Sequence, residues 1–217
     1  MNKSHNIKAE RRDRERLTRK EAILKAARKV FFAKGFMNAT VDEIADSCGL
    51  AKGTIYLYFK SKEEIYVSLM LKGLSLLKQE MEKIHSLRMP SDRLVEKLGE
   101  IYFNFYRKNK EYFRIIFLSS HPDVRARVSH ELLDASIGVG KACLQVVSDV
   151  IKRGIETGIF RKVDPWAAAT ILWAMINGTI MSHEQDPICR DEVIGLELEK
   201  ILKEGTDIIV NGLKERS

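Results

Sequence analysis

Apolar and polar residues follow the period of an α-helix along most of the 217-residue chain. Apolar side chains recur three and four positions apart, as in Ile23, Ala27, Val30 and Phe31, and this spacing places them on one face of a helix. The strict alternation of a half-buried strand is scarce, and the turn dipeptides that mark hairpins are missing. The pattern predicts an all-α protein with about nine helices.

Capping boxes predict where the first helices begin. In such a box a Ser or Thr side chain bonds the amide three residues on, and a Glu at that position bonds back to the cap amide. The first third of the chain holds three of them: Thr18-x-x-Glu21, Thr40-x-x-Glu43 and Ser61-x-x-Glu64. They predict a mobile basic arm over residues 1–17, a compact three-helix domain over 18–62 and a second helical domain over 63–217.

Proline marks the later helix starts. Helices are expected from Pro90, from Pro122 towards Glu156, from Pro165 after the N-cap Asp164, and from about Asp191 to Lys214. The stretch from residue 165 to 183 has no formal charge and falls near the length of a membrane span. It contains several polar residues, so a helix buried on nearly every side explains it better, and no membrane partner is expected.

Charge is distributed unevenly between the two parts of the chain. Residues 1–62 contain 15 Lys and Arg against 7 Asp and Glu, whereas the remaining residues contain 22 against 23. This asymmetry indicates that the first part meets a polyanion, with a solvated basic face as the alternative on charge alone. The arm at 1–17 is expected to reach a minor groove or nearby phosphates, or else to be a disordered terminus. Three cysteines and no secretory signal suit a reducing cytoplasm.

Two short helices joined by a glycine-containing turn, within this basic region, predict a helix-turn-helix. Helical spacing turns Ile55 and Phe59 towards the core, with Leu50 in the turn. Other faces are left to Lys52, Gly53, Thr54, Tyr56 and Tyr58. Gly53 is a poor helix former, which suits a site that a phosphodiester chain approaches closely. A tolerated glycine, and core packing of the two tyrosines, are the alternatives.

The run from Thr40 to Glu63, TVDEIADSCGLAKGTIYLYFKSKE, resembles the DNA-binding signature of the TetR family of transcriptional regulators. The resemblance implies an all-helical homodimer with one helix-turn-helix per subunit and a divergent ligand-binding domain. It implies a DNA contact set, to which Lys60 is added as a further phosphate contact: Thr40, Lys52, Gly53, Thr54, Tyr56, Tyr58, Lys60 and Lys62. Ala51 departs from the hydroxyl residue common at its position, which puts one backbone-anchoring hydrogen bond in doubt.

The second domain is rich in aromatic residues between 101 and 117. Such stripes pack in a core or line an apolar cavity with a few polar groups. The candidate effector pocket comprises Met70, Leu74, Phe103, Tyr106, Tyr112, Phe113, Phe117, Leu144, Trp173 and Asn177.

The last two helices combine wide apolar faces with small residues, as in a four-helix interface across a two-fold axis. The resemblance places a dimer interface there, and packing within one chain is the alternative. The candidate residues are Ile171, Gly178, Leu198, Ile201, Leu202, Gly205, Ile208 and Ile209.

No catalytic constellation, cofactor motif or metal-ligand spacing occurs in the sequence. No enzyme activity and no cofactor are therefore expected. The sequence predicts a ligand-responsive transcriptional repressor that a small apolar or aromatic effector releases from a pseudo-palindromic, double-stranded DNA operator. A nonspecific architectural DNA-binding protein and a helical enzyme are the alternatives.

Overall fold

The computed structural model describes residues 3–117, 124, 127–189 and 195–215, with side chains from residue 10 onward. These residues form α-helices, two short 3-10 helices and an isolated bridge between Phe160 and Lys214, so the expected all-α fold is confirmed. The nine α-helices of the described chain are α1 (Lys3–Asn38), α2 (Val41–Ser47), α3 (Lys52–Tyr56), α4 (Lys62–Glu82), α5 (Ser91–Lys108), α6 (Lys110–Phe117), α8 (His130–Glu156), α9 (Pro165–Gln185) and α11 (Leu198–Leu213). The 3-10 helices are η1 (Lys83–Ser86) and η2 (Pro187–Cys189).

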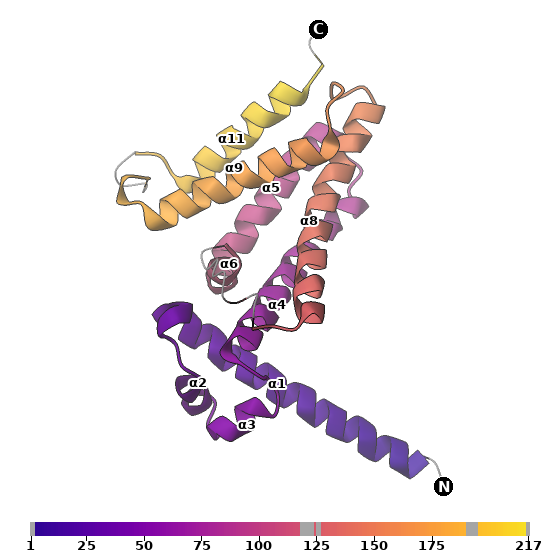
Figure 1. The fold of residues 1–217 in the computed structure, drawn as a ribbon. Coiled ribbons are helices and arrows are strands. Elements are labelled where there is room, and N and C mark those ends of the chain that lie inside the picture. The colour runs from indigo at the N-terminus through magenta and orange to yellow at the C-terminus, as the bar shows by residue number, and fades with distance from the viewer. Residues whose placement is uncertain (1–2, 118–123, 125–126, 190–194, 216–217) are drawn as a thin grey trace.

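Helices α1, α2 and α3 lie together at one end of the molecule, and the remaining helices form a bundle at the other (Figure 1). Helix α4 connects the two ends, because it packs against α1 on one side and against α5, α6 and α8 in the bundle. Helix α11 packs on α5 and α9 at the far side of the bundle. Helix α6 also contacts α1, so both α4 and α6 connect the bundle to the small N-terminal end.

The first helix begins earlier than the sequence predicted. Helix α1 starts at Lys3, and the predicted cap at Thr18 lies inside it, where its hydroxyl donates to the carbonyl oxygen of Arg14 at 2.9 Å. The prediction of a mobile arm is therefore wrong for the described residues. Alternating Arg and Glu residues are good helix formers, and the ion pair between Arg11 and Glu15 supports the helix at i,i+4 spacing.

Other starts agree with the sequence where the cap is local. Ser61 accepts a hydrogen bond from the amide of Glu64, and Asp164 accepts two at the start of α9. Helix α8 begins at His130, after the N-cap Ser129, rather than at Pro122, which lies outside the described residues. Helix α11 begins at Leu198, and the predicted start at Asp191 also lies outside them. Within the described chain, no helix is long and apolar enough to cross a membrane.

Candidate DNA-binding surface and effector cavity

Helix α2 is fixed by its N-terminal cap. The Thr40 hydroxyl accepts the amide of Glu43 at 3.2 Å, and the Glu43 carboxylate accepts the amide of Thr40 at 3.0 Å, which is the predicted capping box. Glu43 also pairs with Lys34 of α1. The buried side of α2, which includes Val41 and Ile44, is thereby held against α1.

The turn after α2 sets the direction of α3. Gly49 has φ of +65°, the left-handed conformation that glycine adopts without strain. The amide of Leu50 donates to the carbonyl oxygen of Ala45 at 2.9 Å, which closes the end of α2. Ala51, the N-cap of α3, makes no side-chain capping bond.

Helix α3 has one buried side and one open side. Ile55 is fully buried, and Phe59, which follows the helix, is 1% exposed. Lys52, Gly53 and Tyr56 are exposed, and Thr54 is half-buried. The buried pair fixes the helix to the domain, and a Cβ on Gly53 would meet no atom of this chain within 4 Å. Packing within the chain therefore does not require this glycine.

Leu57 is a candidate contact that sequence reasoning missed. It is 74% exposed beside the open side of α3, which is unusual for so large an apolar residue. The signal was present in the sequence, because a residue two positions from both Ile55 and Phe59 cannot share their buried face.

Lys52 carries its charge on this open side. Its ammonium group hydrogen-bonds the Asp42 carboxylate at 2.7 Å, and this bond raises the pKa of Lys52 above its ordinary value. Both side chains are at least half exposed, so the pair is weak and exchangeable. Lys52 can therefore leave Asp42 for a phosphate or a base at little cost.

The remaining predicted contacts differ in their surroundings. Lys60 is exposed, whereas Tyr58 is half-buried against the core. The ammonium group of Lys62 donates to three carbonyl oxygens at the end of α1, those of Phe36 at 2.8 Å, Ala39 at 2.9 Å and Met37 at 3.4 Å. These bonds use all three of its protons, so the structure favours a role for Lys62 in holding α1 to α4 over a phosphate contact.

An apolar cavity of about 150 Å³ lies inside the bundle. Its walls come from α4, α5, α6, α8 and α9. Tyr102 supplies the main polar group, and its hydroxyl donates to Asn177 at 2.6 Å. Burial raises the pKa of the Cys143 thiol in the wall to about 11, so the thiol is protonated at neutral pH and is not a nucleophile.

The structure brings only some of the predicted pocket residues to this cavity. Leu74, Phe117, Leu144 and Trp173 line it. The other six do not, because helix rotation turns them elsewhere. Met70 is half-buried at the core, Asn177 reaches the cavity only through Tyr102, and the rest lie in the aromatic packing of α5 and α6 or at its edge: Phe103, Tyr106, Tyr112 and Phe113.

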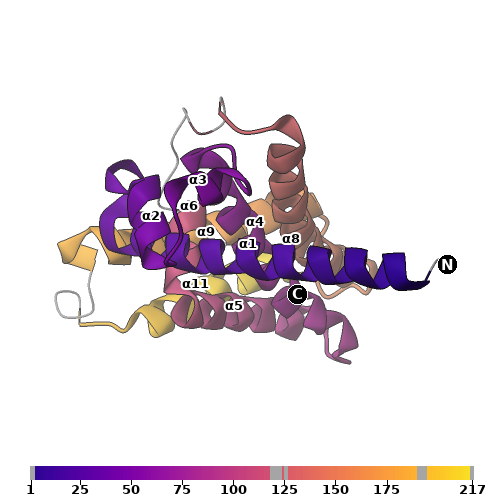
Figure 2. The same ribbon diagram turned by 90° about the horizontal axis from the view of Figure 1, so that it is seen from below.

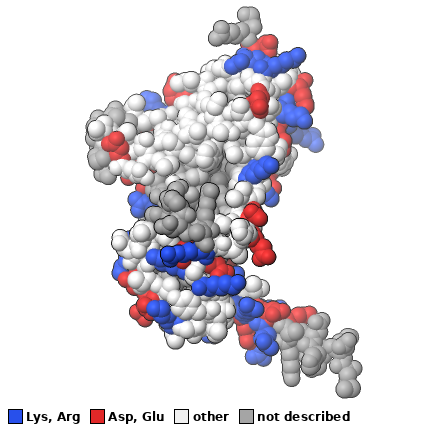
Figure 3. All heavy atoms as spheres, in the orientation of Figure 1, with Lys and Arg blue, Asp and Glu red and all other residues white. Residues whose placement is uncertain are grey.

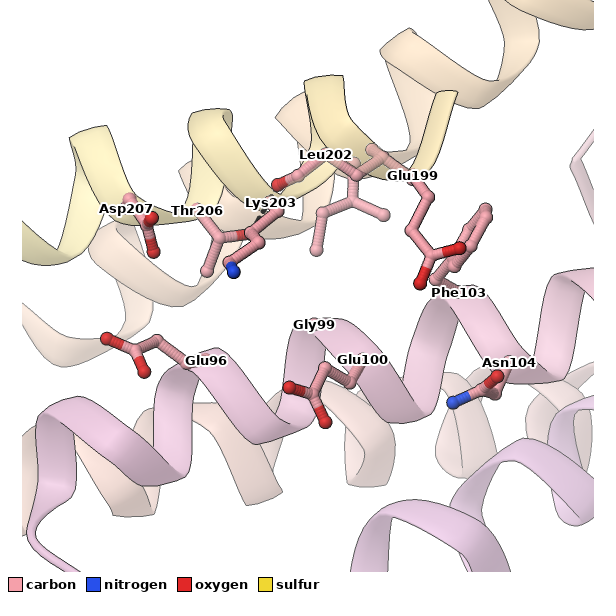
Figure 4. Close-up of a pocket in the computed structure, with 11 residues that line it drawn as sticks. Glu96, Gly99, Glu100, Phe103, Asn104, Glu199, Leu202, Lys203, Thr206 and Asp207 are labelled. Atoms are coloured by element: carbon pink, nitrogen blue, oxygen red, sulfur yellow. Dashed lines mark hydrogen bonds between the residues drawn. The ribbon is translucent and has the colours of Figure 1, made fainter. Parts of the chain in front are cut away.

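A second hollow, of about 270 Å³, lies between α5 and α11 (Figure 4). Its lining is acidic, and several carboxylates have basic neighbours: Glu96 pairs with Arg93 at 2.8 Å and Glu100 with Lys97 at 2.6 Å. Gly99 borders both this groove and the apolar cavity. No group of three His, Cys, Asp or Glu residues able to hold a metal occurs in the described part of the chain.

The predicted dimer residues separate into two sets. Leu198 and Leu202 are 6% and 5% exposed, so packing within their own chain leaves them little surface for a partner. Ile201, Gly205 and Ile209 are half-buried, whereas Ile171, Gly178 and Ile208 are exposed. Helix α9 is thus not buried on nearly every side, because one uncharged face of it is open.

Helix α6 links the cavity to the small N-terminal end. Phe117, at the end of α6, is in the cavity wall. Towards its start, Glu111 pairs with Arg28 of α1 at 2.7 Å, and the Arg28 guanidinium lies 4.8 Å from the ring centre of Tyr112. The Tyr66 hydroxyl of α4 donates to the carbonyl oxygen of Ile115.

Glu184, near the end of α9, joins α9 to α5 and α6. It accepts hydrogen bonds from Tyr106 and, at 3.1 Å, from Arg114, with Lys110 at 4.0 Å. Burial opposes ionisation of Glu184, but the Tyr106 bond and the two positive charges outweigh it and lower the pKa of this carboxyl. Glu184 is therefore ionised at neutral pH, and its contacts hold α9 against α6.

Comparison with known proteins agrees with this arrangement. Residues 23–69 match the family described as bacterial regulatory proteins, tetR family. The chain is 26% identical over 184 residues to the HTH-type transcriptional regulator YhgD of Bacillus subtilis, which covers 83% of this chain and 93% of that protein.

Two solved structures share the fold. The TetR family transcriptional regulator PfmR of Thermus thermophilus superposes with a TM-score of 0.66 at 25% identity, over 89% of this chain and 99% of that one. The Bacillus subtilis regulator FadR, solved in complex with stearoyl-CoA, has a TM-score of 0.72 at 21% identity, over 89% and 98% of the two chains.

Fold and site together define a helix-turn-helix transcriptional regulator that binds DNA. Residues 23–69 of the chain are a DNA-binding domain of the TetR family.

The network around Glu184 makes stability depend on pH. Replacing Glu184 by Gln removes the negative charge and is expected to lower the free energy of unfolding at about pH 7 by about 1–2 kcal/mol, because hydrogen bonds to a charged partner are lost. A carboxyl whose pKa is lowered in the folded state contributes stability above its unfolded pKa of about 4.3, and this is lost as the pH falls through the folded pKa. Urea unfolding of both proteins as a function of pH measures the difference.

The matched control is Glu156→Gln, since among the described residues Glu156 forms an ion pair with Lys152 alone, at the surface and at 4.0 Å. Its unfolding free energy should stay near that of the unaltered protein. If Glu184→Gln and Glu156→Gln were equally stable at every pH, the proposed tie between α9 and α6 would be wrong.

Proposed function

We propose that the protein is a ligand-responsive repressor. A homodimer presents two α3 helices to successive major grooves of a pseudo-palindromic operator, about 34–36 Å apart. An effector in the bundle cavity releases it. This proposal rests on the two sides of α3. Ile55 and Phe59 bury one side, while the open side has no packing role in the described chain.

The proposed contacts follow from exposure and chemistry. Lys52, Thr54 and Tyr56 are the candidates for reading base edges, and the space beside Gly53 admits a phosphodiester chain. Leu57 is added as an apolar contact for a thymine methyl group, since it is exposed and has no polar atom. Thr40, Tyr58 and Lys60 are proposed as backbone contacts, and Lys62 is left out because its ammonium protons are used within the chain.

Selection of bound duplexes from random DNA should therefore yield a two-fold symmetric site. The double variant Thr54→Ala/Tyr56→Ala should bind that site at least about tenfold more weakly and discriminate less among its bases, because base contacts carry the specificity. Fluorescence anisotropy with the selected duplex measures both effects. Lys141→Ala, an exposed change on α8, serves as the control.

A double variant that binds the selected site as tightly as the Lys141→Ala control would refute the assignment of α3. If the unaltered protein showed no preference for any sequence over bulk DNA, the nonspecific architectural alternative would hold instead.

The open faces of α9 and α11 are proposed as the dimer interface. Ile171 and Ile208 are 60% and 65% exposed, and Gly178 leaves room for close helix approach. Residues 165–183 of α9 carry no formal charge although one face of this helix is open, which is unusual for a solvated surface, and a second copy would cover that face. Ile201, Gly205 and Ile209 lie at its margin.

Replacing Ile208 by Glu should therefore produce a monomer in multi-angle light scattering at micromolar concentration, and operator affinity should fall with it. Ile137→Glu is the matched control, because Ile137 is also 60% exposed but lies on α8. A dimer that persists in Ile208→Glu, or a monomeric unaltered protein, would contradict the proposed interface.

The cavity favours a small apolar or aromatic effector. Its volume of about 150 Å³ and its apolar walls resemble a dry cavity that accepts a benzene-sized molecule. The stearoyl-CoA complex of FadR makes a long-chain acyl thioester the second candidate, but a stearoyl chain is several times larger than this space. An acyl ligand would have to open the bundle.

Release is proposed to pass through α6 and α4. An effector beside Phe117 displaces α6, and the bonds from Arg28 and Tyr66 to α6 carry the shift to α1 and α4. The two α3 helices then lose their spacing. A change from a mostly competent to a mostly incompetent population requires about 10⁴-fold preferential binding, or about 5.5 kcal/mol.

Gly140 provides a test, because it borders the cavity and a Cβ there would lie 4.0 Å from Leu74 Cδ1, an ordinary contact. Single-ring aromatic compounds and stearoyl-CoA are screened for a rise in melting temperature and for release of the selected duplex. An aromatic hit should act on the unaltered protein and not on Gly140→Leu, whose side chain fills the cavity. Gly138→Leu is the control, since Gly138 is exposed and has open space around it.

An aromatic hit that acts equally on Gly140→Leu would refute binding in the cavity. One that binds tightly and leaves operator affinity unchanged would refute the release mechanism. A response to stearoyl-CoA alone would replace the small effector by the acyl candidate.

A further inference from the structure

The N-terminal part of α1 extends beyond the rest of the molecule. The helix begins at Lys3, and among the side chains described from residue 10 onward the first buried one is Ile23. At 1.5 Å per residue, about 30 Å of helix precede that point. Both ribbon views show this section projecting past the bundle on the side of the small N-terminal end (Figures 1 and 2).

Three arginines form a single stripe along this section. Arg12, Arg16 and Arg19 are four and three residues apart and therefore share one helix face. The stripe is continuous with the core-facing side of α1, because Ile23 follows Arg12 by three helical turns. It therefore points to the same side of α1 as the helix-turn-helix.

A hollow of about 430 Å³ confirms this direction. It is lined by the three arginines, by Asp13 and Glu15, and by Tyr58, which follows α3. Tyr58 is also one of the proposed backbone contacts. The arginine stripe thus adjoins the helix-turn-helix at Tyr58, directly after α3.

The charges of the stripe are available to a partner. Residues 10–20 contain six basic and three acidic residues. Glu15, which also borders the hollow, pairs with Arg11 at 2.8 Å, whereas Arg12, Arg16 and Arg19 make no ion pair with any described residue. Figure 3 shows blue side chains along the lower end of the molecule and at the base of this projection. Arginine stays protonated at any physiological pH, so the stripe is permanently cationic.

We propose that the N-terminal section of α1 is a second DNA-binding surface that grips the sugar–phosphate backbone outside the bases read by α3. The stripe spans about 10 Å of helix, which is about the axial rise of three nucleotide steps at 3.4 Å per step along one strand. Its contacts are independent of sequence, because guanidinium groups on phosphates position a protein without reading bases. The inference rests on the proposed function and adds flanking duplex to the partner that α3 binds.

The test combines a triple variant with two lengths of duplex. Arg12→Gln/Arg16→Gln/Arg19→Gln removes the stripe but keeps good helix formers. The control, Arg14→Gln/Lys25→Gln/Lys29→Gln, removes the same charge from exposed positions of α1 outside the stripe. A third variant, Arg12→Lys/Arg16→Lys/Arg19→Lys, keeps the positive charge at the three stripe positions. Far-UV circular dichroism checks that each variant is folded.

Affinity for the selected site is measured against salt concentration, on a duplex with flanking base pairs and on one trimmed to the outer edges of the half-sites. On the long duplex the Gln stripe variant should bind at least about tenfold more weakly than the control. Its plot of log affinity against log salt should flatten by about 0.9 for each phosphate that the variant no longer neutralises. The lysine variant should recover most of both effects, and on the trimmed duplex the stripe and control variants should bind alike.

Equal affinity and equal salt dependence of the stripe and control variants on the long duplex would overturn the inference. So would a stripe effect that is unchanged on the trimmed duplex. The Thr54→Ala/Tyr56→Ala variant tests the proposed function independently. If that variant binds the selected site more weakly while the stripe variant binds it normally, the proposed function holds and only the proposal of a second DNA-binding surface is wrong.

Discussion

Burial of Ile55 and Phe59 is the interaction on which the rest of the structure depends. Each fully buried side chain of this size contributes about 1.5–3 kcal/mol, which is large for a helix as short as α3. Such a helix has no stability of its own in water and is held by its packing. Lys20 of α1 lies over the Phe59 ring, 5.2 Å from its centre, so the longest helix also braces this contact. Because this packing holds the buried side of α3, the open side remains available to a partner.

The same reasoning connects the two ends of the molecule. Helix α4 begins at the end of the helix-turn-helix and continues into the cavity wall, so neither end can shift without it. Hydrogen bonds from Lys62 hold the start of α4 against the end of α1, and the hydrogen bond from Tyr66 holds α4 against α6. Glu184 then connects α6 to the helix that carries the open apolar face. Cavity, proposed dimer face and DNA-binding surface are therefore joined by short polar contacts between rigid helices.

Local signals made part of this structure predictable from sequence. The caps at Thr40 and Asp164 involve residues only two or three positions apart, and each is present as predicted. At Ser61 the side-chain cap is present, but the Glu64 carboxylate accepts the amide of Lys60 in place of the amide that a capping box requires. The start of α1 was missed for a local reason too. Thr18-x-x-Glu21 has the letters of a capping box, but the Arg and Glu residues before it continue the helix, and the Thr18 hydroxyl turns to Arg14 instead.

Rotation of the later helices could not be predicted in the same way. In α11, Leu202 and Ile208 both belong to one wide apolar pattern, yet the first is buried against α5 and α9 while the second is 65% exposed. Among the aromatics of α6, Phe113 is fully buried in the core while Phe117 reaches the cavity. These differences depend on how several distant helices meet, which no single-helix periodicity records.

The most direct measurement places a photo-crosslinking amino acid at position 57, where the side chain is exposed and its replacement disturbs no packing. Irradiation with the selected duplex should join the protein to the bases of the half-sites, whereas the same amino acid at position 137 of α8, also exposed, should give no DNA adduct. Adducts of equal yield from both positions, or none from position 57 under conditions where the duplex is bound, would contradict the claim that the open side of α3 faces DNA.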